Sequence, residues 1–484
     1  MAAKPPEGTP PEGTPSEGLR AHVYLLVWGA IVFVLALAFK PAVQNDGAYY
    51  FTYLHALFVS HTFNASTELP HVYTSSTDLF PIGSAILSAP AYLVALLIGG
   101  ARRAPFDAMY TTSYVIASLF YGLMALAISH RIALRVSGSA SAAAIGVAAG
   151  ALTTPLVYYL LYEPSYSHTF SAFTCALFLY FWWRSPDRSL GGWLWLGALG
   201  GLMALVRFQD GLLMAITLLD LPKARWRLLL MVPTAALAFL PQVFVDLAQW
   251  GTLWPQRNPG QPLSALPGHY LQVLLSSHNG LLIWHPFILV AAAGFFFVRD
   301  RRLVVAAAMA FVIETVIDGM LPDWPGGFAF GGRRFIALTP FFVIGFAMAA
   351  TRMRPWLAWL ATGLVTAWNL VLVANLTYVV VSERDPGYLG LLEGQVKALG
   401  FVAREFVQGQ AARDLVLWPV LHQPFRPGWG LALLTLEAAC AAVFVRVLAG
   451  ARRAKEAPAA PVAVLPPVGA PELAPAEIPA LPVP

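Results

Sequence analysis

Apolar stretches about as long as a membrane is thick recur along this chain, separated by short polar segments. They begin at residues 23–39 and continue to residues 433–448. A helix needs ~20 residues to cross ~30 Å of hydrocarbon, and backbone in lipid must satisfy its own hydrogen bonds. The pattern therefore predicts an all-α, polytopic transmembrane protein with about 12–13 spans.

The polar segments between the spans are of two kinds, which sets the orientation. Basic clusters occur in every second segment, at residues 130–135, 184–188, 223–227, 299–302, 352–354 and 452–455. Positive charge favours the cytoplasmic side, and simple alternation of spans places all six clusters there. The outer loops are then residues 40–109, 162–168, 207–210, 249–279, 320–334 and 382–427. We expect a multi-pass protein of a bacterial inner or plasma membrane, with its functional site on the outer face.

Residues 81–100 are apolar enough to cross the membrane, yet a crossing here would disturb the alternation. It would invert every later loop and place five or more basic clusters outside. Pro81, Gly83 and Pro90 favour a kinked or re-entrant helix at the outer face instead. Twelve full spans then remain with both termini cytoplasmic, or thirteen if another segment is also split.

Two outer segments are expected to lie in the membrane interface as helices. Residues 49–58 form an aromatic-rich stretch just after the first span. Apolar residues also recur near helical spacing between charges in residues 391–406. Such amphipathic segments lie in the interface plane, so both would cover a cavity from outside.

Composition bounds the domains and excludes several classes of protein. Apolar residues make up 58% of the chain and charged residues 11%, which is outside the range of soluble domains. Residues 1–20 and 451–484 have the Pro/Gly and Ala/Pro composition of disordered cytoplasmic tails, leaving residues 21–450 as one transmembrane domain. The basic clusters encode topology, so the net charge of +5 does not indicate nucleic acid. Cys175 and Cys440 fall inside predicted spans, so neither a disulfide framework nor a cysteine metal site is expected.

The first candidate site follows the first span. Asp46, then Gly47 and the paired Tyr49 and Tyr50, places a carboxylate at the level of the lipid head groups. A carboxylate there can act as a general base, and the tyrosines can bind substrate. The alternative is a helix cap, in which Asp46 accepts backbone N–H bonds at the start of the aromatic helix.

Two further outer junctions carry unusual polar residues. Glu163 and His168, within residues 162–168, add a carboxylate and an imidazole at the depth of Asp46. They are suited to orienting a base, holding an acceptor hydroxyl or binding a metal, although an ordinary polar turn is the alternative. Arg207 interrupts a long apolar stretch, and it either binds a phosphate or forms a local ion pair with Asp210.

The strongest signal is residues 323–335, with the sequence DWPGGFAFGGRRF directly before a span. Its four glycines let backbone N–H groups approach an anion, and Arg333 and Arg334 suit a phosphate. Arginines on the outer face run against the positive-inside bias, although a tight turn with snorkelling arginines is the alternative. We therefore predict Asp46 and Glu163 as catalytic residues. The predicted substrate-binding residues are Tyr49, Tyr50, His168, Arg207, Trp324, Arg333 and Arg334.

These motifs resemble those of the GT-C class of membrane glycosyltransferases, related to the protein O-mannosyltransferases and the lipid A aminoarabinose transferases. The likeness spans most of residues 23–350. It rests on Asn45-Asp46-Gly47-Ala48-Tyr49-Tyr50, Phe80-Pro81-Ile82-Gly83, Glu163 and Trp324-x-Gly326-Gly327-x-x-x-Gly331-x-Arg333. Protein O-mannosyltransferases carry Asp-Glu where this chain has Asp46-Gly47, which puts protein mannosylation in doubt.

The resemblance implies transfer of a sugar from a polyprenyl-phosphate donor, with a carboxylate base, inversion at the sugar carbon and polyprenyl phosphate as leaving group. A lipid or glycan acceptor is expected, because no large soluble outer domain is present to hold a polypeptide. No cofactor is required and no metal site is predicted, although Mg²⁺ or Mn²⁺ shared by Asp46 and Glu163 is left open. The alternative is a multi-spanning transporter or lipid flippase, which would favour internal repeats and charges within spans. A polymerase or ligase of polysaccharide assembly is a nearer rival.

Overall fold

The computed structural model describes residues 43–68, 80–101, 104–185, 188–253, 268–327, 329–379 and 385–407. Every regular element in these ranges is a helix, which confirms the predicted all-α fold class. The predicted first span at 23–39, the last span at 433–448 and both terminal tails lie outside the described residues.

Five helices are long and apolar enough to cross a membrane: Ala108–Ser137, Trp226–Trp250, Arg301–Met320, Arg333–Ala350 and Pro355–Thr377. Four shorter apolar helices accompany them, at Gly83–Gly99, Ala140–Leu152, Leu190–Val206 and Ile288–Phe297. The polytopic helical architecture is therefore as predicted. The total of twelve spans stays a prediction.

The elements that carry the site begin with α2 (Asp46–Phe58), α4 (Ala108–Ser137), α6 (Leu156–Leu161), α7 (His168–Arg184) and α8 (Leu190–Val206). A 3-10 segment η3 (Phe208–Asp220), α14 (Arg301–Met320) and η6 (Arg333–Leu338) complete the set. The other helical elements are η1 (Ala65–Thr67), α3 (Gly83–Gly99), α5 (Ala140–Leu152), α9 (Leu221–Ala224), η4 (Arg225–Leu230), α10 (Met231–Trp250), α11 (Gln272–Leu275), α12 (Leu281–Trp284), α13 (Ile288–Gly294), η5 (Phe295–Phe297), α15 (Thr339–Ala350), α16 (Pro355–Ala374), η7 (Asn375–Val379) and α17 (Gly387–Val407).

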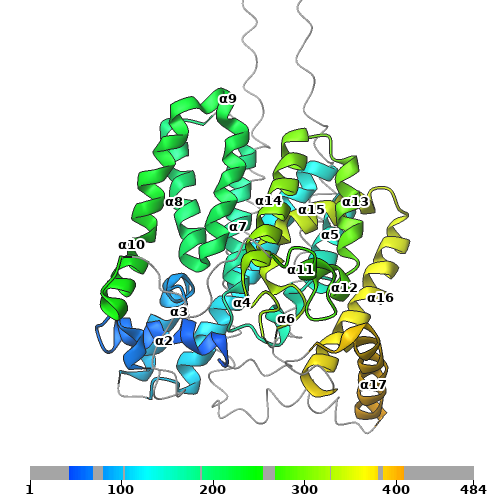
Figure 1. The fold of residues 1–484 in the computed structure, drawn as a ribbon, viewed down its shortest axis with the longest axis horizontal. Helices are drawn as coiled ribbons and strands as arrows, with labels where there is room; N and C mark the ends of the chain where they lie inside the picture. The colour runs from blue at the N-terminus through cyan, green and yellow to red at the C-terminus, as the bar shows by residue number, and fades with distance from the viewer. Residues whose placement is uncertain are drawn as a thin grey trace, which may run out of the picture. The chain divides into compact units, whose positions relative to one another are not determined.

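Helices α2 and α3 are oriented differently from the long helices. In Figure 1, α7, α8 and α10 run up the view, whereas α2 crosses it and α3 is seen along its axis. The start of α3 lies against the end of α8, since a Cβ at Gly83 would lie 2.4 Å from the carbonyl oxygen of Leu205. That residues 81–100 do not cross with the other spans stays a prediction.

The centre of the bundle is built from small residues and one fully buried helix. All residues of α15 are buried, and α15 packs against α4, α5 and α13. A Cβ at Gly146 of α5 would lie 2.5 Å from the carbonyl oxygen of Val343. Small residues let helices in lipid approach closely, so the Ala/Gly sequence of α5 fixes this contact.

Two of the predicted cytoplasmic basic clusters meet at the bundle end opposite the site. Asp220 accepts from Arg188 at 2.7 Å and from Arg302 at 2.6 Å. The Arg302 guanidinium also lies 3.9 Å from the centre of the Trp182 ring. Helix α7 has 17 residues, so this end is ~25 Å from the end that begins at His168.

Candidate functional site

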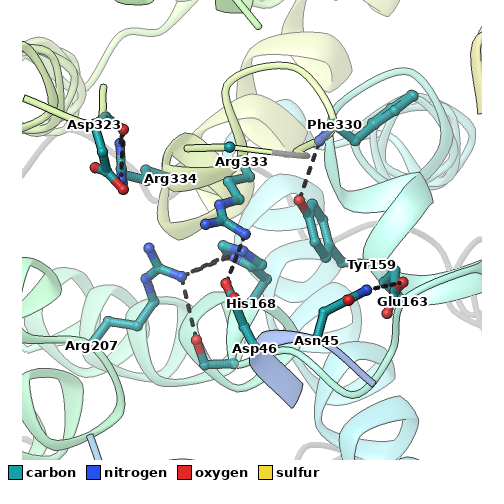
Figure 2. Close-up of polar contacts among 12 residues, drawn as sticks. Asn45, Asp46, Tyr159, Glu163, His168, Arg207, Asp323, Phe330, Arg333 and Arg334 are labelled. Carbon is teal, nitrogen blue, oxygen red and sulfur yellow. Dashed lines mark hydrogen bonds and ion pairs between the residues drawn. The ribbon is translucent and has the colours of Figure 1, made fainter. Parts of the chain in front are cut away.

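Asp46 is the first residue of α2, and its side chain does not cap that helix. The N-cap is Asn45, whose φ of 51° lies in the left-handed region and which makes no side-chain capping bond. The Asp46 carboxylate instead accepts from Arg333 Nη1 at 2.9 Å, 287 residues away along the chain. The helix-cap alternative for Asp46 is therefore wrong, because its oxygen is turned toward the Gly-rich segment (Figure 2).

The residue after Asp46 is Gly47, and the packing around it leaves no room for a side chain. A Cβ here would lie 2.1 Å from Ser165 Oγ and 2.9 Å from the Ser165 carbonyl oxygen. The turn between α6 and α7 therefore sits directly on the start of α2. Any side chain at position 47 would push the Asp46 and Glu163 segments apart.

Glu163 lies in that turn, and Figure 2 shows its carboxylate beside Asn45. Its Oε1 accepts from Gln44 at 2.6 Å and from Asn45 at 3.3 Å. Its Oε2 is buried without a hydrogen-bond partner among the described residues. Burial raises the pKa of Glu163 from 4.5 to about 7, and the nearby Asp46 charge adds to the increase. This carboxyl group therefore exchanges its proton near neutral pH.

Arg333 follows the Gly-rich segment, whose glycines take backbone conformations that other residues avoid. Gly326, Gly327 and Gly332 have φ values of 72°, 63° and 63°. Asn279 Nδ2 donates to the Pro325 carbonyl at 2.8 Å and holds the turn from the α11–α12 side. The sharp turn delivers the Arg333 guanidinium to Asp46.

The surroundings of Arg333 are aromatic and mostly buried. Its guanidinium lies 5.6 Å from the centre of the Tyr166 ring, and electrostatic interactions link it to Tyr159. The side chain of Arg333 is 15% exposed and that of Asp46 28% exposed. Such a poorly hydrated ion pair is electrostatically stronger than one at the surface. The pair nevertheless opens toward solvent on the Asp46 side.

Arg207 and His168 form the second cation group of the site. Arg207 ends α8 and donates from Nη1 to His168 Nδ1 at 2.9 Å and to Ser167 Oγ at 3.3 Å. Burial and the Arg207 charge lower the pKa of His168 well below its usual value. An arginine can only donate, so the facing ring nitrogen accepts and the imidazole is neutral.

Tyr50 joins the two cation groups. It is buried, and burial raises its pKa to about 12. Coulombic interactions link Tyr50 to Asp46, Arg207 and Arg333. The structure thus brings together six of the predicted site residues: Asp46, Tyr50, Glu163, His168, Arg207 and Arg333.

The other three predicted residues lie nearby in different roles. Arg334 donates from Nη2 to Asp323 at 2.7 Å and from Nη1 to the Trp324 carbonyl at 3.1 Å, so it turns away from Arg333 (Figure 2). The Trp324 ring stacks on His269 with centroids 5.8 Å apart. Tyr49 packs on Phe80, 5.1 Å between ring centroids. Arg334 and Trp324 therefore brace the Gly-rich segment in this structure.

Sequence reasoning missed several residues of the site and its support. Tyr166 and Ser167 lie within residues 162–168, where Glu163 and His168 were singled out, and Tyr159 lies just before them in α6. Only the packing shows which way these three side chains point. Glu314 and Asp318 were missed although two acids four residues apart inside an apolar stretch are a signal. Among the described residues, no group of three or more His, Cys, Asp or Glu side chains is placed to hold a metal ion.

Comparison with known proteins finds only a weak similarity of fold to solved structures. No protein-family model matches the chain, and no curated protein matches its sequence. Similar solved structures include ArnT from Cupriavidus metallidurans in the apo state, with a TM-score of 0.49, and the same protein bound to undecaprenyl phosphate, with a TM-score of 0.48. Both structures are 17% identical in sequence to this protein, and each alignment covers 82% of this chain and 74% of the ArnT chain.

Proposed function

We propose that this protein is a membrane glycosyltransferase that moves a sugar from a polyprenyl-phosphate donor to a lipid or glycan acceptor on the outer face. The observation that carries the proposal is the Asp46–Arg333 ion pair, 2.9 Å long, with Glu163 and the Arg207–His168 pair beside it. These groups come from segments far apart in sequence and meet at one end of the bundle. Two acids and two cations in a poorly hydrated setting suit proton transfer beside a phosphate.

Arg333 and Arg207 are the proposed phosphate ligands. A guanidinium binds phosphate oxygens through paired N–H donors, and a phosphate competes with Asp46 for Arg333. As the bond from the sugar carbon to the phosphate oxygen breaks, negative charge develops on the leaving polyprenyl phosphate. Fixed cations in a site of low hydration stabilise this charge without reorganising, which typically contributes a few kcal/mol to lowering the barrier.

Asp46 is the proposed general base. Donor binding to Arg333 would release the Asp46 carboxylate from its ion pair. The Asp46 carboxylate then takes the proton of the acceptor hydroxyl as the hydroxyl oxygen bonds to the sugar carbon. Attack from the face opposite the phosphate inverts the configuration at that carbon. Glu163 is the second candidate, because its Oε2 lacks a hydrogen-bond partner among the described residues and its pKa of about 7 suits proton exchange.

The proposal is tested by comparing cells with and without this protein, using mass spectrometry of lipid-linked sugars and surface glycans. A glycosyltransferase predicts that the sugar donor accumulates and that one glycan loses a residue. Cells expressing Asp46→Asn should match cells lacking the protein. Unchanged glycans together with an altered solute or lipid distribution would instead support the transporter or flippase alternative.

A further inference from the structure

Helix α14 places two acidic side chains directly behind the arginines of the site. Glu314 and Asp318 are four residues apart, so they lie on one face of the helix. Both are buried, at 0% and 2% exposure. Helix α14 packs against η3, which follows Arg207, and against η6, which contains Arg334. The two acids therefore face the inner side of the candidate site.

A third carboxylate joins them from η3. Asp210 is fully buried, accepts from Ser171 Oγ at 2.6 Å and lies 3.9 Å from Arg207 Nε. Asp318 lies 3.7 Å from Arg334 Nε. Arg207 and Arg334 thus each have a buried carboxylate nearby, at an N–O distance longer than that of a tight ion pair.

Glu314 lies between these two contacts and differs from both acids. Neither of its carboxylate oxygens has a hydrogen-bond partner among the described residues. Its electrostatic neighbours are Asp210, Asp318, Arg207 and Arg334. A buried carboxylate without a donor is strongly disfavoured in its charged form. Asp210 and Asp318 each have an arginine within 4 Å, whereas Glu314 has no such close cation among the described residues.

We propose that Glu314 binds a proton in the protein interior and, together with Asp210 and Asp318, positions Arg207 for phosphate binding. Ionised Glu314 would attract the guanidinium inward, away from Ser167 and His168. The proton on Glu314 keeps Arg207 extended into the site. Glu314 is thus a positioning residue, and this consequence rests on the proposed phosphate-binding function.

The titratable and charged groups that face Glu314 come from several elements. They are Asp210 on η3, Asp318 on α14 itself, Cys175 on α7, and Arg207 and Arg334 at the site. Asp323 faces Asp318 from the Gly-rich segment. Glu314→Gln keeps the size of the side chain and mimics its neutral form, so it isolates the contribution of the Glu314 proton.

The test uses full-length protein in nanodiscs, with undecaprenyl phosphate as the probe. Binding is measured from neutral to alkaline pH for the wild type, Glu314→Gln and Glu314→Asp. Wild-type affinity should fall about tenfold, relative to Glu314→Gln at the same pH, as Glu314 ionises, since a charge-assisted hydrogen bond is lost. Glu314→Asp should retain the alkaline loss. The phosphate of the lipid also titrates, but this affects all variants equally, so comparing variants at the same pH isolates the effect of Glu314.

A second measurement does not depend on lipid binding. Infrared difference spectra should show the carbonyl band of a protonated carboxylic acid that is absent in Glu314→Gln. The control is Glu393→Gln, an exposed acid on α17 that should retain the band and the wild-type pH dependence. Infrared spectra also decide the protonation if the Glu314→Gln protein is too unstable for binding measurements.

The outcomes separate this inference from the proposed function. A wild type that binds no undecaprenyl phosphate at any pH overturns the proposed donor class, while the infrared band still decides whether Glu314 holds a proton. Lipid binding with the same pH dependence in wild type and Glu314→Gln overturns the positioning role. A band unchanged in Glu314→Gln overturns the proton assignment.

Discussion

Asp46 and Glu163 are neighbouring carboxylates whose surroundings give them different properties. Asp46 is bound by a cation, Arg333, at 2.9 Å, whereas Glu163 is bound only by the amides of Gln44 and Asn45. Burial favours the neutral form of Glu163, whereas the Asp46 carboxylate is held in an ion pair. This difference is the physical basis for giving the two acids separate roles.

Asp46→Asn should lower turnover by ~10²-fold or more, because the lost group acts in proton transfer. Donor affinity should not fall, and it should rise if the phosphate has to displace Asp46 from Arg333. The measurement is kcat and donor Kd on purified protein. Glu163→Gln should reduce kcat less if Glu163 only orients the acceptor. Near-normal kcat in Asp46→Asn would contradict the assignment and transfer the base role to Glu163.

The activity should depend on pH through Glu163. Its pKa of about 7 means that its carboxylate form increases as pH rises through neutrality. If that form accepts the acceptor proton or orients the hydroxyl, kcat/KM should rise by about tenfold per pH unit below pH ~7 and level off above it. Glu163→Gln should lack this rising limb. A variant that retains the same limb would assign the titration to another group.

Arg333→Lys should weaken donor binding by about tenfold, because lysine keeps the charge but loses the paired N–H geometry. Arg334→Lys is the matched control: its guanidinium is bound to Asp323 and to the Trp324 carbonyl, so it should affect stability more than donor Kd. Wild-type donor affinity in both variants would remove the arginines from the phosphate site.

At the scale of elements, the site depends on how closely α2 approaches the turn between α6 and α7. Because Gly47 has no side chain, it packs directly on Ser165, and this contact brings the backbone of Asp46 close to the segment that carries Glu163. Helix starts and tight turns are local features, but their close approach needs a residue without Cβ. Gly47, which stands where the protein O-mannosyltransferases carry Glu, is therefore explained by packing.

Gly47→Ala should lower stability by about 1–3 kcal/mol, the usual cost of overpacking, and should reduce activity through displacement of Asp46. Gly363→Ala in α16 is the control, because no atom lies within 4 Å of a Cβ there. A helix-interior glycine to alanine change should be neutral or add up to ~1 kcal/mol. Thermal unfolding in detergent measures both, and equal stability of the two variants would contradict the predicted clash.

At the scale of the whole molecule, a cluster of basic residues around Asp220 and the candidate site lie at opposite ends of the long helices. Arg188, Asp220 and Arg302 meet at one end, and Arg333 and Asp46 at the other. The positive-inside bias then predicts that the first end lies at the cytoplasmic side and the second at the outer face. The orientation of the bundle stays a prediction.

Cysteine labelling from outside tests this orientation in a background lacking Cys175 and Cys440. A cysteine at exposed Gly327 should react, and one at exposed Ser185 should not. Ala224 is only 5% exposed, so the neighbouring, exposed Lys223 is the better second cytoplasmic probe. Labelling of Ser185→Cys in intact cells would invert the assignment.

The sequence by itself determined the features that the bilayer and the local backbone impose. Apolar length specified the helical fold, and the Gly-rich segment before a span specified a turn with arginines at its end. Local patterns also placed Asp46, Glu163 and Arg207 at span ends, since charges there cost less than charges in hydrocarbon.

Only the tertiary structure decided which of these groups meet. Asp46 pairs with Arg333 across 287 residues, while the adjacent Arg334 turns to Asp323. Neighbouring residues leave a turn in different directions, and no periodicity records which helix end lies opposite. The burial that leaves Glu314 without a hydrogen-bond partner among the described residues likewise arises from the packing of α14 on η3 and η6. Spans follow from local length and composition, whereas ion pairs and pKa values follow from contacts between distant segments.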